Sequence, residues 1–274
     1  MSKKRFELLS EAQWELIEPL LPEPKRRKDK RGRPWASNRA CMEGILWVLQ
    51  TGAALRFLPD KYPSPATCWR RLKQWEEQDV WLDAWRTLLG ALDGEGLLRW
   101  EETFLDGSFA PAKKGALRSV KPSAARGRSG WYWSTVAVFR WEFGSKVPLR
   151  EKLRLRKPRS PKPRSPKLKS LAPKADRDRR KRVIADRAYD SDPLRERLAK
   201  RGIDLIVPYR NNSKLRRYQD GRKLRRYKRR WIIERTNAWL GQFRRLLVRH
   251  ENLLSTYRAF FYLACLWITL RRCL

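Results

Sequence analysis

Two aspartates stand where apolar strands are predicted to end. Asp106 directly follows Phe104 and Leu105, and Asp186 closes a short apolar run that begins at Val183. Strand ends that meet at one edge of a sheet bring the side chains that follow them close together, so the two carboxylates are expected to be neighbours. Paired carboxylates repel each other unless a cation lies between them. The sequence therefore predicts a cation site at this edge.

Glu234 is the candidate for a third ligand, because it is the only acid in the helical segment 227–247. A polar face runs along this helix, roughly 200° around the axis from the apolar face that contains Ile232. Its members are Arg230, Glu234, Asn237, Gly241 and Arg245. The ordinary alternative is an i,i+4 ion pair between Arg230 and Glu234 on a solvated face, although Arg before Glu is the less favourable order.

The three acids Asp106, Asp186 and Glu234 are predicted to be both the metal ligands and the catalytic residues. The chain has one His and four scattered Cys, which leaves oxygen atoms as ligands and favours Mg²⁺ or Mn²⁺. Three such carboxylates would hold two ions about 3.5–4 Å apart, activating a water or a sugar hydroxyl at a phosphodiester.

The charge of the chain favours a polyanionic partner. There are 65 Lys and Arg against 29 Asp and Glu, which gives a net charge of +36 and a pI near 11.0. Residues 1–106 hold 18 basic and 17 acidic residues, so nearly all of the excess lies after Asp106. A surface that tracks a phosphate backbone explains this asymmetry, and double-stranded DNA is the expected partner. A ribosome-type RNA binder, or basic tails on an unrelated core, are the alternatives.

Cysteine use and hydropathy favour a cytoplasmic protein. Cys41, Cys68, Cys265 and Cys273 form no CxxC pair, so neither disulfides nor a zinc site are predicted. The longest apolar run, 259–270, is shorter than the roughly 20 residues that span a bilayer, so no membrane partner is expected.

Residues 1–99 are predicted to form a small all-α, helix-turn-helix-like domain. A capping box at Ser10 opens the first helix, a second ends at Gly52, a third begins near Thr67 and a fourth covers 80–92. The third helix is expected to point its basic residues outward, toward DNA. These residues are Arg70, Arg71 and Lys73. Any small helical domain has a basic surface, however, and this is the alternative.

Residues 100–274 are predicted to form an α/β domain, a mixed sheet with flanking helices. Strands are expected at 104–105, 131–143, 183–186 and 204–208, and the final helix is expected to be buried against the sheet. Asp190 is interpreted as a turn residue and Asp192 as a helix N-cap. The basic, Pro- and Ser-rich segment at about 146–182 is predicted to be disordered when unbound.

Several stretches resemble the insertion-sequence five group of bacterial DDE transposases. They are "LDGSFAPAKKGA", "IADRAYDSDPLRERLAKRGIDLIVPYR", "QDGRKLRRYKRRWIIERTNAWLGQFRRLLVRHENL", "YRAFFYLACLWITLRR" and, in the N-terminal part, "LSEAQWELIEPLLP" and "GILWVLQTGAALRFLPDKYPSPATCWRRLKQW". The resemblance covers most of the chain. It implies an RNase H-like catalytic fold, with Asp106, Asp186 and Glu234 as the metal-binding acids.

The resemblance also implies a reaction and a set of DNA contacts. Metal-dependent hydrolysis at terminal inverted repeats would free a 3′-hydroxyl, which then attacks target DNA, and a homodimer that associates with the nucleoid is expected. The family signature around the last acid is met by Tyr227, Arg230 and Glu234. It fails at Gly241, where a Lys is implied, and Arg244 or Arg245 is the suggested replacement as a phosphate contact.

The interval 130–181 departs from the family pattern. The family implies two strands and a helix there, whereas the sequence favours at most one strand before the "RSPK" repeats. One hypothesis is a frameshifted copy with a damaged sheet, which gives the alternative function of an inactive remnant that only binds DNA. A functional basic insertion is the other reading. A tyrosine recombinase fits poorly, because the chain has a single histidine, His250.

Overall fold

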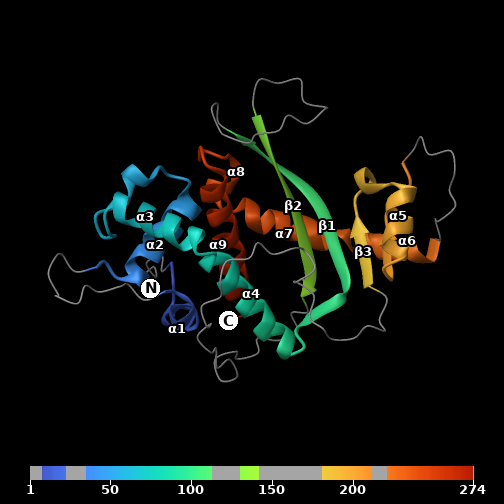
Figure 1. Cartoon of the computed structure of the whole chain (residues 1–274), viewed down its shortest axis with the longest axis horizontal. Coiled ribbons are helices and arrows are strands. Elements are labelled where there is room, and N and C mark those ends of the chain that lie inside the picture. Colours follow the sequence, from blue (N-terminus) through green and yellow to red (C-terminus); the bar gives the residue numbers. More distant parts are fainter. Residues whose placement is uncertain (1–7, 23–34, 113–129, 142–180, 211–220, 274) are drawn as a thin grey trace, which may run out of the picture.

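The computed structural model describes residues 8–22, 35–112, 130–141, 181–210 and 221–273 (Figure 1). The helices are α1 (Glu11–Ile17), α2 (Asn38–Thr51), α3 (Pro65–Glu77), α4 (Val80–Gly94), α5 (Asp192–Ala199), α6 (Gly221–Tyr227), α7 (Trp231–Gly241), α8 (Arg244–Leu247) and α9 (Leu254–Cys273). The strands are β1 (Leu98–Ala112), β2 (Gly130–Trp141), β3 (Lys181–Ala185) and β4 (Ile203–Ile206). Short 3-10 helices cover Glu18–Leu20, Leu55–Phe57, Arg187–Tyr189 and Lys228–Arg230. The predicted mixed α/β class with a helical N-terminal region is confirmed.

Local capping residues set the boundaries of the N-terminal helices. The Ser10 hydroxyl accepts a hydrogen bond from the backbone of Gln13, whose side chain accepts one from the backbone of Ser10, so the predicted capping box is present. Gly52 ends α2 with φ of +73°, a conformation that favours glycine. A Cβ at this position would also lie 2.9 Å from Cβ of Arg244. Helix α2 therefore ends where the sequence predicts.

The four strands form one mixed sheet in the order β2-β1-β3-β4. Strand β2 is antiparallel to β1, whereas β3 is parallel to β1 and β4 is parallel to β3. The prediction that the first strand ends at Asp106 is wrong, because β1 continues to Ala112 in its pairing with β2. The parallel pairing of β1 with β3 does stop at Leu105, so Asp106 is the first residue beyond that ladder. The second predicted strand is confirmed at slightly different bounds.

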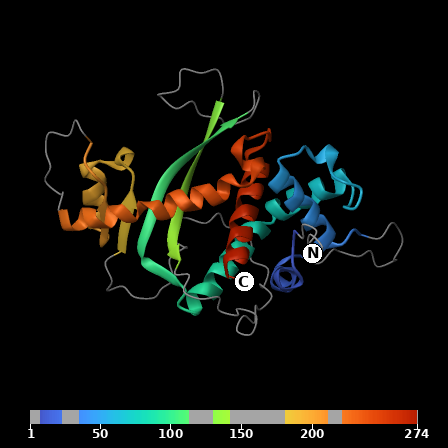
Figure 2. The ribbon, with the colours of Figure 1, turned by 180° about the vertical axis from the view of Figure 1, so that it is seen from behind.

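A different helix covers each face of the parallel strands. On one face Phe104, Ile184 and Ile206 pack against Ile232 and Ile233 of α7. The opposite face is covered by α5, and its cluster contains Ala185, Leu205 and Val207 with Leu194 and Leu198 of that helix. Figure 2 shows α7 crossing the strands. Because strand side chains alternate between faces, Asp106 and Asp186 lie on the face of α7, two residues beyond Phe104 and Ile184.

Helix α9 is buried, as predicted, but the sheet is not its chief partner, although Phe261 packs against the cluster that contains Phe104. The helix packs chiefly on α4 and α3 and shares one hydrophobic core with α1 to α4. Two polar contacts support this arrangement: Arg258 pairs with buried Glu76, and the Trp85 indole donates to the hydroxyl of Thr269. The apolar stripes of α3 and α4 need a partner, and α9 supplies it.

Some predictions lie outside the described residues. The basic segment at about 146–182 falls almost wholly within 142–180, which the structure does not describe, so the frameshift hypothesis remains a hypothesis.

Cys41, Cys68 and Cys265 are free thiols. Among the helices described, none has the length and apolar character needed to cross a bilayer.

Candidate active site

Arg230 lies where the three predicted ligands meet. Its guanidinium nitrogens lie 3.6 Å from Asp106 Oδ1 and 3.5 Å from Asp186 Oδ1. The carboxylate of Glu234 lies 3.8 Å from the same guanidinium. One cationic group therefore contacts carboxylates that come from β1, from the residue after β3 and from α7. The alternative i,i+4 pair of Arg230 with Glu234 is present, but it is one contact of three.

The register of the sheet brings the two aspartates together. Its last parallel pair is Leu105 with Ala185, so Asp106 and Asp186 are the next residues on adjacent strands. The exposed fraction of the side chain rises from 16% at Asp106 through 39% at Asp186 to 62% at Glu234. The site is thus anchored in the sheet and opens to solvent at Glu234.

Asn237 is a member of the site to which sequence reasoning assigned no role. Its side-chain amide donates a hydrogen bond of 3.0 Å to Asp106 Oδ2. Its own Oδ1 is buried without a hydrogen-bond partner among the described residues. The position of Asn237 three residues after Glu234, on the same helix face, was the signal that could have found it.

Replacing Asn237 by alanine is expected to weaken Mn²⁺ binding roughly tenfold, because residues that orient a metal ligand typically contribute this much. Isothermal titration calorimetry of the full chain measures it. Asn252→Ala, a change at an exposed position between α8 and α9, is the control. Equal affinities in the two variants would contradict an orienting role for Asn237.

Burial and charge act in opposite directions on Arg230. Burial disfavours its charged form, but Tyr227, Asp186 and Asp106 outweigh this, so the pKa of Arg230 is raised above its ordinary value. Arg230 is therefore a permanent cation among three carboxylates. Within the described ranges, no three His, Cys, Asp or Glu side chains are close enough together to hold a metal ion as they stand.

Glu102 anchors the segment that carries Arg230. It is a buried β1 residue whose Oε1 accepts hydrogen bonds from Arg226 at 2.7 Å and from Arg229 at 2.8 Å. Both arginines lie just before α7, and Tyr227 packs against the cluster formed by Phe104 and its neighbours. These contacts fix the start of α7 against β1, and with it the position of Arg230.

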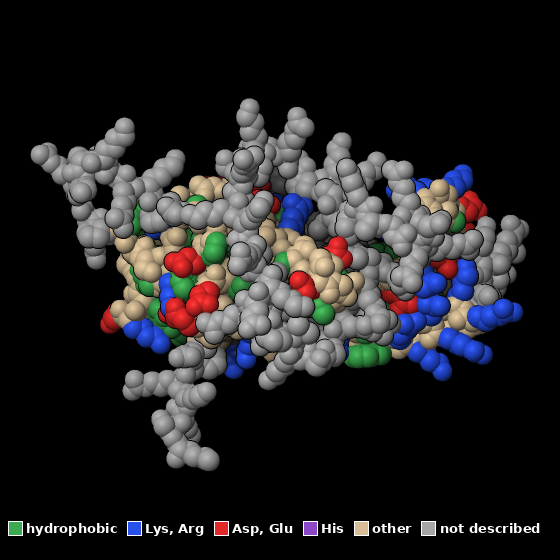
Figure 3. Space-filling view, turned by 90° about the horizontal axis from the view of Figure 1, so that it is seen from below, with side chains coloured by type: hydrophobic (Ala, Val, Ile, Leu, Met, Phe, Trp, Pro, Cys, Tyr) green, Lys and Arg blue, Asp and Glu red, His purple; other side chains and the backbone are tan. Residues whose placement is uncertain are grey.

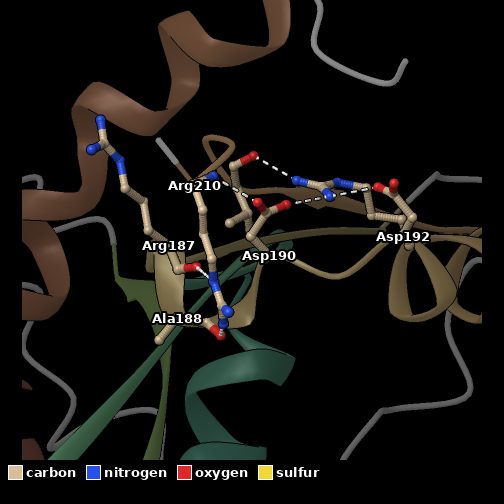
Figure 4. A network of polar contacts seen from close by, with 7 residues as sticks. Arg187, Ala188, Asp190, Asp192 and Arg210 are labelled. Atoms are coloured by element: carbon tan, nitrogen blue, oxygen red, sulfur yellow. Dashed lines mark hydrogen bonds and ion pairs between the residues drawn. The ribbon is translucent and has the colours of Figure 1, made fainter. Parts of the chain in front are cut away.

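A second polar network involves the segment that follows Asp186 in the chain, residues 187–192 (Figure 4). The side chain of Asp190, which is 7% exposed, accepts hydrogen bonds from Arg195 Nη1 at 2.5 Å and from the backbone N–H of Arg210 at 2.6 Å. Asp190 closes the turn Arg187–Tyr189 as predicted, because its backbone N–H donates to the carbonyl of Arg187, and its side chain has a further role that the sequence did not show. Asp192 is not the N-cap of α5, since Ser191 occupies that position and Asp192 pairs with Arg195.

The structure separates the residues predicted to bind DNA into two groups. Arg70 and Lys73 are exposed on α3, and Arg244 is exposed at the start of α8. Arg71 was expected to point outward, but it is buried, stacks on Trp35 and donates to the carbonyl of Ala36. The aromatic rings and that carbonyl offer its guanidinium a better environment than solvent.

Arg245 is likewise occupied by contacts within the protein. Its guanidinium donates to Glu251 at 2.6 Å and to the carbonyls of Gly52 and Ala53. This leaves exposed Arg244 as the better replacement for the Lys missing at Gly241. Tyr227 is half-buried and interacts with Arg230 rather than extending into solvent.

Lys and Arg side chains gather at the end of the molecule that contains α5 and α6, as Figure 3 shows. The exposed basic residues there include Arg187, Arg197, Lys200, Arg201, Arg210, Arg222, Lys223, Arg225 and Lys228. This end adjoins the strands that carry the acids. A polyanion that reached the three carboxylates would also meet this basic surface.

Two family models match the chain. The model described as "Putative transposase of IS4/5 family" matches residues 9–85, and the model described as "Transposase DDE domain" matches residues 163–269. Asp186 and Glu234 lie inside the second match, whereas Asp106 lies between the two. The chain therefore belongs to the insertion-sequence transposases with a DDE domain, and the function that this membership gives it is DNA transposition.

Curated relatives of the chain come from two bacteria, and two of these relatives belong to the insertion element IS402. "Insertion element IS402 uncharacterized 16.2 kDa protein" of Burkholderia cepacia is 41% identical over 104 residues, 37% of this chain and 71% of the relative. "Putative transposase for insertion sequence element IS402" of the same organism is 43% identical over 93 residues, 33% of this chain but only 40% of the relative. "Uncharacterized protein y4sN" of Sinorhizobium fredii is 29% identical over 123 residues, 45% of this chain and 91% of the relative. No solved structure gives a significant match to the chain.

Proposed function

We propose that this chain cleaves and joins DNA at a site formed by Asp106, Asp186 and Glu234, which would hold two Mg²⁺ or Mn²⁺ ions. The observation that supports the proposal most strongly is the convergence of the three carboxylates on the guanidinium of Arg230. Three negative charges and one positive charge attract a divalent cation, and carboxylate oxygens suit these ions. The buried Oδ1 of Asn237, which has no hydrogen-bond partner within the described part of the chain, adds a further oxygen beside Asp106.

Some residues of the site are held in place by the fold, whereas others are free to change position when substrate binds. Bound ions would lower the pKa of an attacking water or hydroxyl and neutralise the charge that develops on the phosphate. Asp106 is fixed by β1 and by the amide of Asn237, whereas Glu234 is exposed and can adjust to a substrate. Arg230 would leave the carboxylates and turn its planar guanidinium to a phosphate oxygen, a geometry that it matches well.

The proposed substrate is double-stranded DNA that carries the terminal inverted repeats of the element. Hydrolysis would free a 3′-hydroxyl, which then attacks a phosphodiester of the target DNA, with two copies of the chain in the active complex. The proposed DNA contacts are Arg70, Lys73, Arg230 and Arg244. Arg71 and Arg245 are omitted because their guanidinium groups are occupied.

The finer organisation is part of the same proposal. An RNase H-like catalytic domain at 100–274 would follow a helical DNA-binding domain at 1–99, and α9 of the catalytic domain would complete the hydrophobic core of the helical one. The order and directions of the strands support this, since Asp106 and Asp186 lie where the parallel strands β1 and β3 end their pairing. We propose that the protein acts in the cytoplasm and associates with the nucleoid when bound to DNA.

Nicking of DNA that carries the element's own ends tests the proposal. With Mg²⁺ or Mn²⁺ present, the full chain is expected to cleave, and Glu234→Ala is expected to lose at least about a hundredfold in rate because one ligand of the ions is gone. Glu196→Ala, at an exposed position on α5, is the matched control and is expected to cleave normally.

The test also separates the proposal from its alternative. DNA binding without cleavage, by the full chain and by Glu234→Ala alike, would mean that the protein is an inactive remnant that only binds DNA. Cleavage that persists in Glu234→Ala would contradict the assignment of the third acid.

A further inference from the structure

The placement of Asp186 depends on backbone that has little regular structure of its own. Strand β3 ends at Ala185, and Asp186 is followed by the single 3-10 turn Arg187–Tyr189. Within that turn, the amide of Tyr189 donates to the carbonyl of Asp186. The Asp186 carboxylate is 39% exposed and lies 3.5 Å from Arg230. The position of the Asp186 carboxylate must therefore depend largely on the contacts that fix the turn Arg187–Tyr189.

Arg210 holds that segment through its side chain. It follows β4 and belongs to a different part of the chain, yet its Nη2 donates to the carbonyl of Ala188 at 2.7 Å. Its Nε donates to the carbonyl of Arg187 at 3.2 Å (Figure 4). These two carbonyls belong to the two residues that directly follow Asp186. The rigid fork of the guanidinium suits two neighbouring acceptors.

The carboxylate of Asp190, in the loop after β3, makes further contacts with Arg210 and Arg195. Its Oδ2 accepts from the backbone N–H of Arg210, while its Oδ1 accepts from Arg195. Arg195 is buried, stacks on Tyr209 at 4.5 Å and donates to the carbonyl of Val207. The loop after β3 is thus joined to the loop after β4 by hydrogen bonds in both directions.

We propose that Arg210 and Asp190 are positioning residues for Asp186, and that the network of Asp190, Arg195 and Arg210 fixes the carboxylate where the ions would bind. The inference rests on the proposed function. It differs from a purely structural role, because the hydrogen bonds of the Arg210 side chain are made to the segment that carries the ligand. Residues that support metal ligands in this way typically account for 10–100-fold in metal affinity or activity.

Arg210→Ala is the sharpest test. The substitution removes the two contacts to carbonyls but keeps the backbone N–H that binds Asp190, and Arg210 is exposed, so the fold is expected to survive. Mn²⁺ affinity of the full chain, measured by calorimetry without DNA, is expected to fall roughly tenfold. Arg210→Lys is expected to recover part of it, since an ammonium group can replace one of the two donors.

Two controls make each outcome decisive. Arg201→Ala removes an exposed arginine near the end of α5 and is expected to leave Mn²⁺ affinity unchanged. Urea unfolding of each variant reports stability separately. An Arg210→Ala chain that loses stability but binds Mn²⁺ as tightly as the parent would overturn the positioning role alone. A parent chain that binds no Mn²⁺ would overturn the proposed function together with it.

Discussion

Strand cleavage by the Asp106→Asn variant is expected to fall by about a thousandfold or more, equivalent to about 4 kcal/mol of transition-state stabilisation. Asparagine has the shape of aspartate but lacks the charge that would hold the ions. Asp106 is the least exposed of the three carboxylates and is held by both Arg230 and Asn237, so its loss is expected to have the largest effect. Single-turnover cleavage of DNA that carries the element's ends measures the change.

DNA binding by the same variant is expected to stay close to that of the parent. Arg230 keeps Asp186 and Glu234 as neighbours, and the basic surface is untouched. Asp204→Asn is the matched control, because Asp204 lies on β4 of the same sheet and pairs with Lys223 away from the acids. If the two variants cleaved equally well, Asp106 could not be one of the catalytic acids.

Phe104→Ala is expected to lower the free energy of unfolding by about 3–5 kcal/mol, the usual result of emptying a large buried aromatic site. Phe104 is fully buried and belongs to one cluster with Ile184 of β3, Ile206 of β4, and Ile232 and Ile233 of α7. It thus joins the elements that position all three acids. Urea unfolding measures the stability.

Leu105→Ala is the control for this substitution. Leu105 lies on the same strand but faces the cluster beneath α5, and it is only partly buried. A loss of about 1–2 kcal/mol is expected there, because less apolar surface returns to water. Equal losses in the free energy of unfolding for the two variants would contradict the conclusion that the packing of Phe104 between the sheet and α7 is important for stability.

Local sequence signals were sufficient for the N-terminal helix boundaries and for much of the candidate site. The capping box at Ser10 and the glycine at position 52 act through neighbouring backbone groups, so they can be read from a few residues. Asp186 follows a short apolar strand, and helical periodicity placed Glu234 on the same face as Arg230. These predictions needed no knowledge of distant contacts.

The errors share a different cause, which is contact between segments far apart in the chain. Strand β1 continues beyond Asp106 because β2 pairs with it, and the burial of Arg71 depends on Trp35 and Ala36. Helix α9 was predicted to pack against the sheet because its apolar residues show that it is buried but do not show which element covers it. The role of Asp190 became visible only with Arg195 and Arg210 around it.

The shared core of α9 with α1 to α4 has a consequence for the order of events during synthesis. Trp85 and Thr269, which are hydrogen-bonded, are separated by 184 residues. The N-terminal helices therefore emerge from the ribosome long before α9, which covers them. Their apolar faces stay exposed until α9 has been synthesised. Non-local contacts of this kind slow folding and leave surface open to aggregation. Translation that stopped before α9 would release N-terminal helices with an exposed hydrophobic core, which chaperones would bind and proteases would cleave.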